Sequence, residues 1–153
     1  MNNNSDNDVI KMLKDLCQLD IDAAYAYEQA LKQIDDQKIH QEIESFRQDH
    51  LRHIDDLNDL LKKLGQEPLE ISKDFKGFLI EGFTAIRSMT GIEGALSAME
   101  GNEKTTNKHY SEALKDHPNL DLEVKTLLEN NYGDEKTHLN YIQNTLKQLK
   151  EKN

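Results

Sequence analysis

The stretch DEKTH at residues 134–138 contains the spacing Glu-x-x-His, and an incomplete copy, DHLRH, occurs at residues 49–53. Residues three positions apart in a helix lie on the same face, one turn from each other. A carboxylate and an imidazole at this spacing can bind one metal ion, or two ions about 4 Å apart. Two such helices facing each other predict a dinuclear metal site inside a helical bundle.

The composition of the 153-residue chain favours helices over strands. It contains two Pro, seven Gly and no Trp, and it is rich in Leu, Lys, Glu, Asp, Gln and Ala. These residues have high or neutral helix propensity, whereas strand-type runs of Val, Ile, Tyr and Thr are missing. The length is that of one domain with a substantial core.

The net charge of −10 argues against nucleic-acid binding, and the single cysteine argues against an internal disulfide. An acidic surface repels phosphate backbones, so we expect no nucleic-acid partner. We also expect no membrane association, because the chain has neither a basic amphipathic helix nor an apolar run of about 18 residues. Cys17 has no second cysteine for a disulfide, and the polar N-terminus does not resemble a signal peptide. Both features predict a cytoplasmic protein.

Helical periodicity predicts an all-α fold in which residues 8–153 form one domain behind a disordered tail at residues 1–7. The four predicted helices run over residues 8–36, 38–64, 94–115 and 120–150. Gly65 and Pro68 mark the end of the second helix. Residues 66–90 form a long crossover in which residues 75–86 predict a short amphipathic helix. A connection of this length can start the third helix parallel to the second, as in ferritin-like four-helix bundles.

The chain also contains an internal repeat of two helix hairpins. An offset of 83 residues aligns Tyr27 with Tyr110 and Asp20 with Glu103, and an offset of 85 aligns residues 49–54 with 134–139. The polar residues on the inward faces therefore match between the two halves of the chain.

The matched polar residues are predicted to form a metal site at one height in the bundle. Burying several unpaired carboxylates would cost a prohibitive free energy, whereas a pair of divalent ions supplies four positive charges. Across each tight turn, the spacings of 30 and 32 residues place the helix partners at similar heights. The predicted ligands are Asp20, His50, His53, Glu103, Glu135 and His138.

These residues resemble the pattern of the ferritin-like di-iron carboxylate proteins, such as bacterioferritin and rubrerythrin. Those proteins use one Glu on each of two helices and Glu-x-x-His on the other two. The resemblance covers about residues 10–150 and is closer still to small bacterial ferritin-like four-helix-bundle proteins of unassigned function. It implies a pair of divalent ions, with iron the leading candidate and zinc or manganese as alternatives. An iron-loaded protein would be a ferroxidase-type oxidoreductase or stress-related protein that needs an electron-transfer partner.

Two positions depart from the family pattern. Asp20 replaces a Glu, and His50 stands where the second motif has its Glu. The loss of that carboxylate counts against tight di-iron binding and oxygen activation, and three imidazoles favour zinc or a single ion.

The pattern has a second interpretation, a non-enzymatic interaction or structural bundle. In that interpretation His50 and His53 bind Asp20 and Glu103 without metal. A zinc-binding bundle without redox activity is a further alternative, and the amphipathic bundle is compatible with a homodimer.

Residues beside the inward faces receive predicted roles of their own. Asp49 and Asp134 flank the predicted site and are expected behind the ligands or on the surface. Asp22 and Glu28 fall off the inward face and are predicted to be solvated.

Overall fold

A computed structural model describes residues 3–76 and 90–152 of the chain. Four long helices dominate the fold, and a short helix lies in the described part of the connection between the second and third of them. The helices are α1 (Asn3–Leu31), α2 (Gln37–Lys63), α3 (Ile71–Asp74), α4 (Gly91–Asp116) and α5 (Leu122–Lys152). Among the described residues, none of the helices has both the length and the apolar character needed to cross a lipid bilayer.

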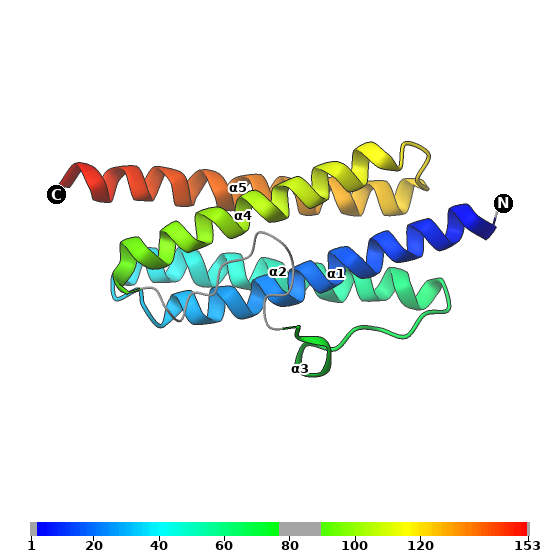
Figure 1. The fold of residues 1–153 in the computed structure, drawn as a ribbon, viewed down its shortest axis with the longest axis horizontal. Helices are drawn as coiled ribbons and strands as arrows, with labels where there is room; N and C mark the ends of the chain where they lie inside the picture. Colours follow the sequence, from blue (N-terminus) through cyan, green and yellow to red (C-terminus); the bar gives the residue numbers. More distant parts are fainter. Residues whose placement is uncertain (1–2, 77–89, 153) are drawn as a thin grey trace.

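The topology is that of a ferritin-like bundle, as the sequence predicted. α1 and α2 form one antiparallel hairpin, and α4 and α5 form the other (Figure 1). α4 starts at the same end of the bundle as α2, so the two helices run parallel (Figure 1). Each helix of one hairpin packs against a helix of the other, α1 on α4 and α2 on α5.

The first helix differs from its predicted boundaries at both ends. It begins at Asn3 and ends at Leu31, whereas the sequence predicted a helix over residues 8–36. Asp6 lies in the first turn, where its negative charge favours helix formation by interacting with the helix dipole. Five of the seven residues expected to form a tail are therefore helical.

The turn between α1 and α2 is closed by a side-chain cap. Oδ1 of Asp36 accepts a hydrogen bond of 3.0 Å from the backbone N–H of Ile39, which stabilises the start of α2. At the other end of α2, Gly65 has a φ of +76°. This left-handed conformation suits glycine and confirms the predicted end of the helix.

Replacing Asp36 by Ala should lower the free energy of unfolding by about 1 kcal/mol, because the cap is lost. Urea denaturation monitored by circular dichroism measures the change. Asp35→Ala is the matched control, since Asp35 is the exposed preceding residue. An equal loss in both variants would count against a specific cap at Asp36.

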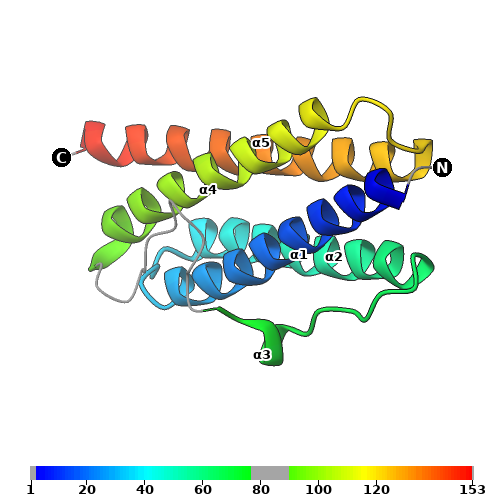
Figure 2. The same ribbon diagram turned by 45° about the vertical axis from the view of Figure 1, so that its right-hand side comes forward.

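The connection after α2 covers the outer side of the first hairpin, opposite α4 and α5 (Figure 2). The side chain of Asn58 bonds both the backbone N–H and the carbonyl of Leu69, at 2.9 and 2.8 Å. Further along, the rings of Tyr25 and Phe75 stack with centroids 3.8 Å apart. The amphipathic helix predicted for residues 75–86 falls almost entirely on residues outside the described part of the chain.

This connection overturns the prediction that Asp22 is solvated. Asp22 is fully buried, and its Oδ1 accepts hydrogen bonds from Gln18 Nε2 (3.1 Å) and from the backbone N–H of Lys76 (3.4 Å). The face of α1 that a plain bundle would expose is covered by residues following α3. Glu28, by contrast, is exposed as predicted.

The buried apolar side chains form two clusters, one toward each end of the bundle. On α2, Phe46 belongs to one cluster and Ile54 to the other; on α5, Ile142 and Leu128 are divided in the same way. Between the two apolar clusters lies a layer of buried polar side chains. This polar layer contains the predicted metal ligands.

Candidate metal centre

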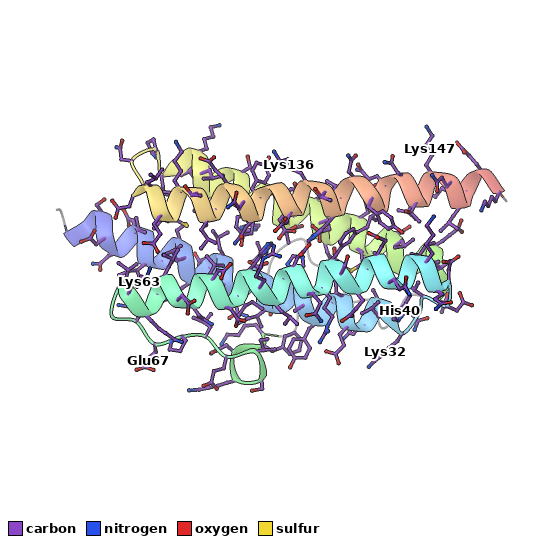
Figure 3. The ribbon with its side chains drawn as sticks, turned by 180° about the vertical axis from the view of Figure 1, so that it is seen from behind. Lys32, His40, Lys63, Glu67, Lys136 and Lys147 are labelled. Atoms are coloured by element: carbon purple, nitrogen blue, oxygen red, sulfur yellow. The ribbon has the colours of Figure 1, made fainter. Side chains whose placement is uncertain are left out.

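The structure brings all six predicted ligands together in the middle of the bundle. Asp20 comes from α1, His50 and His53 from α2, Glu103 from α4, and Glu135 and His138 from α5. None of these six side chains is more than 1% exposed. Figure 3 looks onto the face formed by α2 and α5, and side chains of these helices fill the space between them.

The six residues form two overlapping groups, each able to surround one ion. The first consists of Asp20, His50, His53 and Glu135; the second consists of His50, Glu103, Glu135 and His138. His50 and Glu135 belong to both groups. They are also the two positions that the internal repeat aligns with each other.

His50 lies at the centre of the cluster and faces both groups. Its Nδ1 lies 2.7 Å from Oδ1 of Asp20. On the other side of the ring, its Nε2 lies 3.3 Å from Oε1 of Glu103 and 3.5 Å from Oε2 of Glu135. The imidazole thus stands between the carboxylates of α1 and those of α4 and α5.

Two buried atoms of the cluster lack a hydrogen-bond partner, namely Oε1 of Glu135 and Nδ1 of His138. The first lies 3.3 Å from Nδ1 of His53, and the second lies 3.4 Å from both Glu103 and Glu135. Such atoms are costly in a protein interior unless something compensates them. An imidazole nitrogen and a carboxylate oxygen left in this way are donors that suit a divalent transition metal.

Two tyrosines hold the carboxylates of the opposite hairpin. Tyr27 on α1 donates a hydrogen bond to Oε1 of Glu103 on α4. Tyr110 on α4 donates one of 2.6 Å to Oδ2 of Asp20 on α1. The two tyrosines that the repeat aligns therefore each bind a carboxylate of the other hairpin.

Asp49 and Asp134 lie behind the histidines, as expected for residues that support a metal site. Nε2 of His138 lies 2.8 Å from Oδ2 of Asp49, and Nε2 of His53 lies 2.9 Å from Oδ2 of Asp134. Arg52 forms ion pairs with both aspartates at the surface. These contacts fix the outer nitrogen of each ring and leave the inner nitrogen, Nδ1, facing the centre.

Thr106 is a member of the cluster that the sequence analysis missed. Its hydroxyl lies 2.9 Å from Oε2 of Glu103 and 3.2 Å from Oε2 of Glu135, so it links two buried carboxylates. The sequence feature that could have identified it is its position three residues after Glu103, on the same face of the helix. The repeat offers no guide, because the aligned residue of α1 is Ala23.

The electrostatic environment of the histidines favours their protonated form when no metal is bound. Burial lowers the pKa of His50, but Glu135 and the bond to Asp20 outweigh it and raise the pKa to about 9. Burial also opposes the charge of the other two rings. Asp20 and Asp134 nevertheless raise the pKa of His53 to about 12, and Asp49 and Glu103 raise the pKa of His138 to about 11.

The carboxyl groups respond to the same contacts in different directions. Burial raises the pKa of Asp20, but His53 and His50 together hold it at about 2. Against the same effect, the nearby imidazoles of His138 and His50 hold the pKa of Glu103 well below its usual range. Burial and the neighbouring Glu103 raise the pKa of Glu135. Glu135 is thus the inner carboxylate that is least stabilised in its charged form.

Comparison with known proteins found a family model that matches the sequence and a solved structure with a similar fold. Residues 8–116 match the model described as "Domain of unknown function (DUF2383)". The structure is similar to that of a mutant of Dps1 from Mycobacterium smegmatis, with a TM-score of 0.80 over 95% of this chain and 99% of that one. The sequence identity is 14%, so the likeness concerns the fold. No curated protein matches the chain.

Proposed function

Since this chain belongs to the DUF2383 family and folds as a ferritin-like bundle, we propose that it binds divalent transition-metal ions at the centre of the bundle. Up to two ions would be held, one in each of the overlapping groups. The ligands would be Asp20, His50, His53, Glu103, Glu135 and His138.

One observation carries this proposal: two buried atoms of the cluster, Oε1 of Glu135 and Nδ1 of His138, lack hydrogen-bond partners. A polar layer meant only for stability would be expected to satisfy such atoms. The surrounding contacts also support the proposal, because tyrosine, threonine and aspartate side chains hold the inner carboxylates and imidazoles in place, as supporting residues do around metal ligands.

A bound metal would supply Lewis acidity and, if it is iron, a centre for electron transfer. Around it, the chain excludes water through the two apolar clusters that close the layer on both sides. Glu135 would contact both ions through its separate oxygens. With iron in both groups, the reaction we propose is oxidation of ferrous to ferric iron, with molecular oxygen or peroxide accepting the electrons. With zinc, the centre would be structural.

A competing function is a purely structural network in which protons take the place of the metal. Its support is the raised pKa of all three histidines, because three imidazolium groups would balance the three inner carboxylates. In that case the protein would fold fully and bind no metal at neutral pH.

Metal analysis distinguishes these functions. Protein purified without chelator and reconstituted separately with Fe²⁺, Zn²⁺ and Mn²⁺ is desalted and analysed by mass spectrometry of the elements. We expect one to two ions per chain, and a content near zero for all three metals would refute metal binding. Exposure of the iron-loaded protein to oxygen then tests the oxidase activity, since an unchanged absorption spectrum would eliminate the reaction and leave binding intact.

Metal affinity should increase steeply with pH. The ions need neutral imidazoles, whereas the metal-free histidines hold their protons beyond neutral pH, with the lowest pKa at about 9 for His50. For each proton that the metal displaces, the apparent affinity should increase by about tenfold for every unit that the pH rises, as long as the pH is below that pKa. Calorimetric titrations between pH 6 and 8, in buffers of different ionisation enthalpy, measure both the affinity and the protons released. An affinity independent of pH would contradict this assignment of ligands.

The same shifts predict how the metal-free protein responds to alkali. The pKa of each histidine is higher in the folded state than its ordinary value of 6.5. The stabilisation is therefore complete below about pH 6.5 and declines as the pH rises toward 9 and beyond. Metal affinity and the stability of the metal-free protein thus change in opposite directions over this range.

A further inference from the structure

The two overlapping groups of ligands are not equivalent. We call the group of Asp20 the Asp20 half, with Nδ1 of His50, Nδ1 of His53 and Oε1 of Glu135. We call the other group the Glu103 half, with Nε2 of His50, Nδ1 of His138, Oε1 of Glu103 and Oε2 of Glu135. In the Asp20 half, His50 lies within hydrogen-bond distance of the carboxylate, at 2.7 Å. In the Glu103 half, the nitrogens and the oxygens lie farther apart, at up to 3.5 Å.

In the Glu103 half, the four distances between a nitrogen and an oxygen ligand match those of a tetrahedral site. Nε2 of His50 lies 3.3 Å from Glu103 and 3.5 Å from Glu135, and Nδ1 of His138 lies 3.4 Å from each of the same two oxygens. Four ligands placed tetrahedrally at 2.0–2.1 Å from a zinc ion are roughly 3.3–3.4 Å apart. Two nitrogens and two carboxylates also balance the charge of one divalent ion.

The ring orientations favour the same half. Nδ1 of His50 is bonded to Asp20, and Nε2 of His138 is bonded to Asp49. When each ring is neutral and donates its proton to that outer carboxylate, its other nitrogen carries a lone pair. Both lone pairs then face the Glu103 half, as in a carboxylate–histidine–metal arrangement.

In the Asp20 half, the His50 nitrogen on that side, Nδ1, is already bonded to Asp20. Oδ1 of Asp20 lies 2.7 Å from His50 and 3.2 Å from His53, and Oδ2 accepts 2.6 Å from Tyr110. The carboxylates themselves do not distinguish the halves, because Glu103 likewise accepts hydrogen bonds, from Tyr27 and Thr106. The difference lies at His50: an ion in the Asp20 half could use Nδ1 of His50 only if the bond to Asp20 broke, whereas Nε2 stays available to the Glu103 half. Oε1 of Glu135 remains without a hydrogen-bond partner on this side, which leaves this half able to take a second, weaker ion.

From these differences we infer that the centre fills in order. The first ion would be held in the Glu103 half, whose two nitrogen and two carboxylate ligands suit zinc, and His50 is the residue that determines this preference. Asp20 is a positioning residue for that ion, since it acts on the metal through His50. The inference rests on the proposed function and extends it, because it specifies which half binds first and which class of metal that half prefers.

Titration of the metal-free protein with Zn²⁺ tests the order, using His138→Gln and His53→Gln as matched variants. The internal repeat aligns these two histidines, each three residues after the shared position of its helix, so the two changes are matched in position and affect different halves. We expect His138→Gln to weaken the first binding event by more than about 100-fold. We expect His53→Gln to keep the first event and lose the second. Asp20→Asn should weaken the first event by about 10–100-fold, as expected for a residue that orients a ligand.

Cobalt provides a readout that needs no variant, so the test does not depend on the folding of altered proteins. Co²⁺ in a tetrahedral site absorbs visible light far more strongly than in an octahedral site. We expect intense visible absorption that is complete at one equivalent of Co²⁺ per chain. Weak absorption at one equivalent, or loss of the tight event in His53→Gln, would overturn the order of filling while leaving metal binding established. Failure of the unaltered protein to bind Zn²⁺, Co²⁺ or Fe²⁺ would instead refute the proposed function.

Discussion

Glu135→Gln should abolish tight metal binding in both halves of the centre. Its two oxygens face different halves, Oε1 toward His53 and Oε2 toward His138, so a single change removes a charged ligand from each. We expect the affinity to fall by more than the roughly 10–100-fold loss that follows removal of a supporting residue. Metal content after desalting and calorimetric titration measure the effect.

Glu129→Gln is the matched control for this variant. Glu129 lies on the same helix, is exposed and forms a surface ion pair of 3.8 Å with Lys125, which contributes little to stability. It should bind metal as the unaltered protein does. If Glu135→Gln retained two ions with unchanged affinity, Glu135 would not be a ligand and the shared role assigned to it would be wrong.

Metal binding should stabilise the folded protein strongly. The centre joins four helices, and the unfolded chain cannot assemble the same ligands, so the ion binds mainly to the folded state. A free metal concentration of 1,000 times the Kd should raise the free energy of unfolding by about 4 kcal/mol. Urea denaturation with and without Zn²⁺ measures the difference, and a chelator should reverse it.

Glu135→Gln again supplies the control, because its stability should not respond to the same metal concentration. If the metal stabilised both proteins equally, binding would take place at the surface and not at the centre. No stabilisation of the unaltered protein would favour the network held together by protons.

The architecture followed from helical periodicity and from the length of one connection. A run of apolar residues at helical spacing specifies which face of each helix is inward, and a crossover of about 25 residues permits the third helix to start beside the beginning of the second. The ends of the helices were less accessible. α1 extends to Asn3, and its first residues are all polar. They are compatible with a helix, but they carry no apolar periodicity that could have predicted one.

The six central residues could be found because a buried charge is conspicuous in an apolar pattern and because the repeat duplicates it. The inequality of the two halves could not be predicted, since it depends on which ring nitrogen faces which carboxylate. The sequence shows that His50 replaces a carboxylate, but only the structure shows its ring between Asp20 and Glu103. Thr106 and Asp22 were missed for a related reason, because their burial depends on what other helices and the connection place beside them.

The hydrogen bonds of Tyr27 and Tyr110 couple the folding of the two hairpins. Tyr27 of the first hairpin serves Glu103 of the second, and Tyr110 of the second serves Asp20 of the first. Separating the hairpins would break both of these hydrogen bonds and would expose to water the two apolar clusters, each of which contains residues of both hairpins. The half-molecules should therefore not persist as folded intermediates, and unfolding should be all-or-none. Either half expressed alone would have to find another copy of itself to recover the missing hydroxyl.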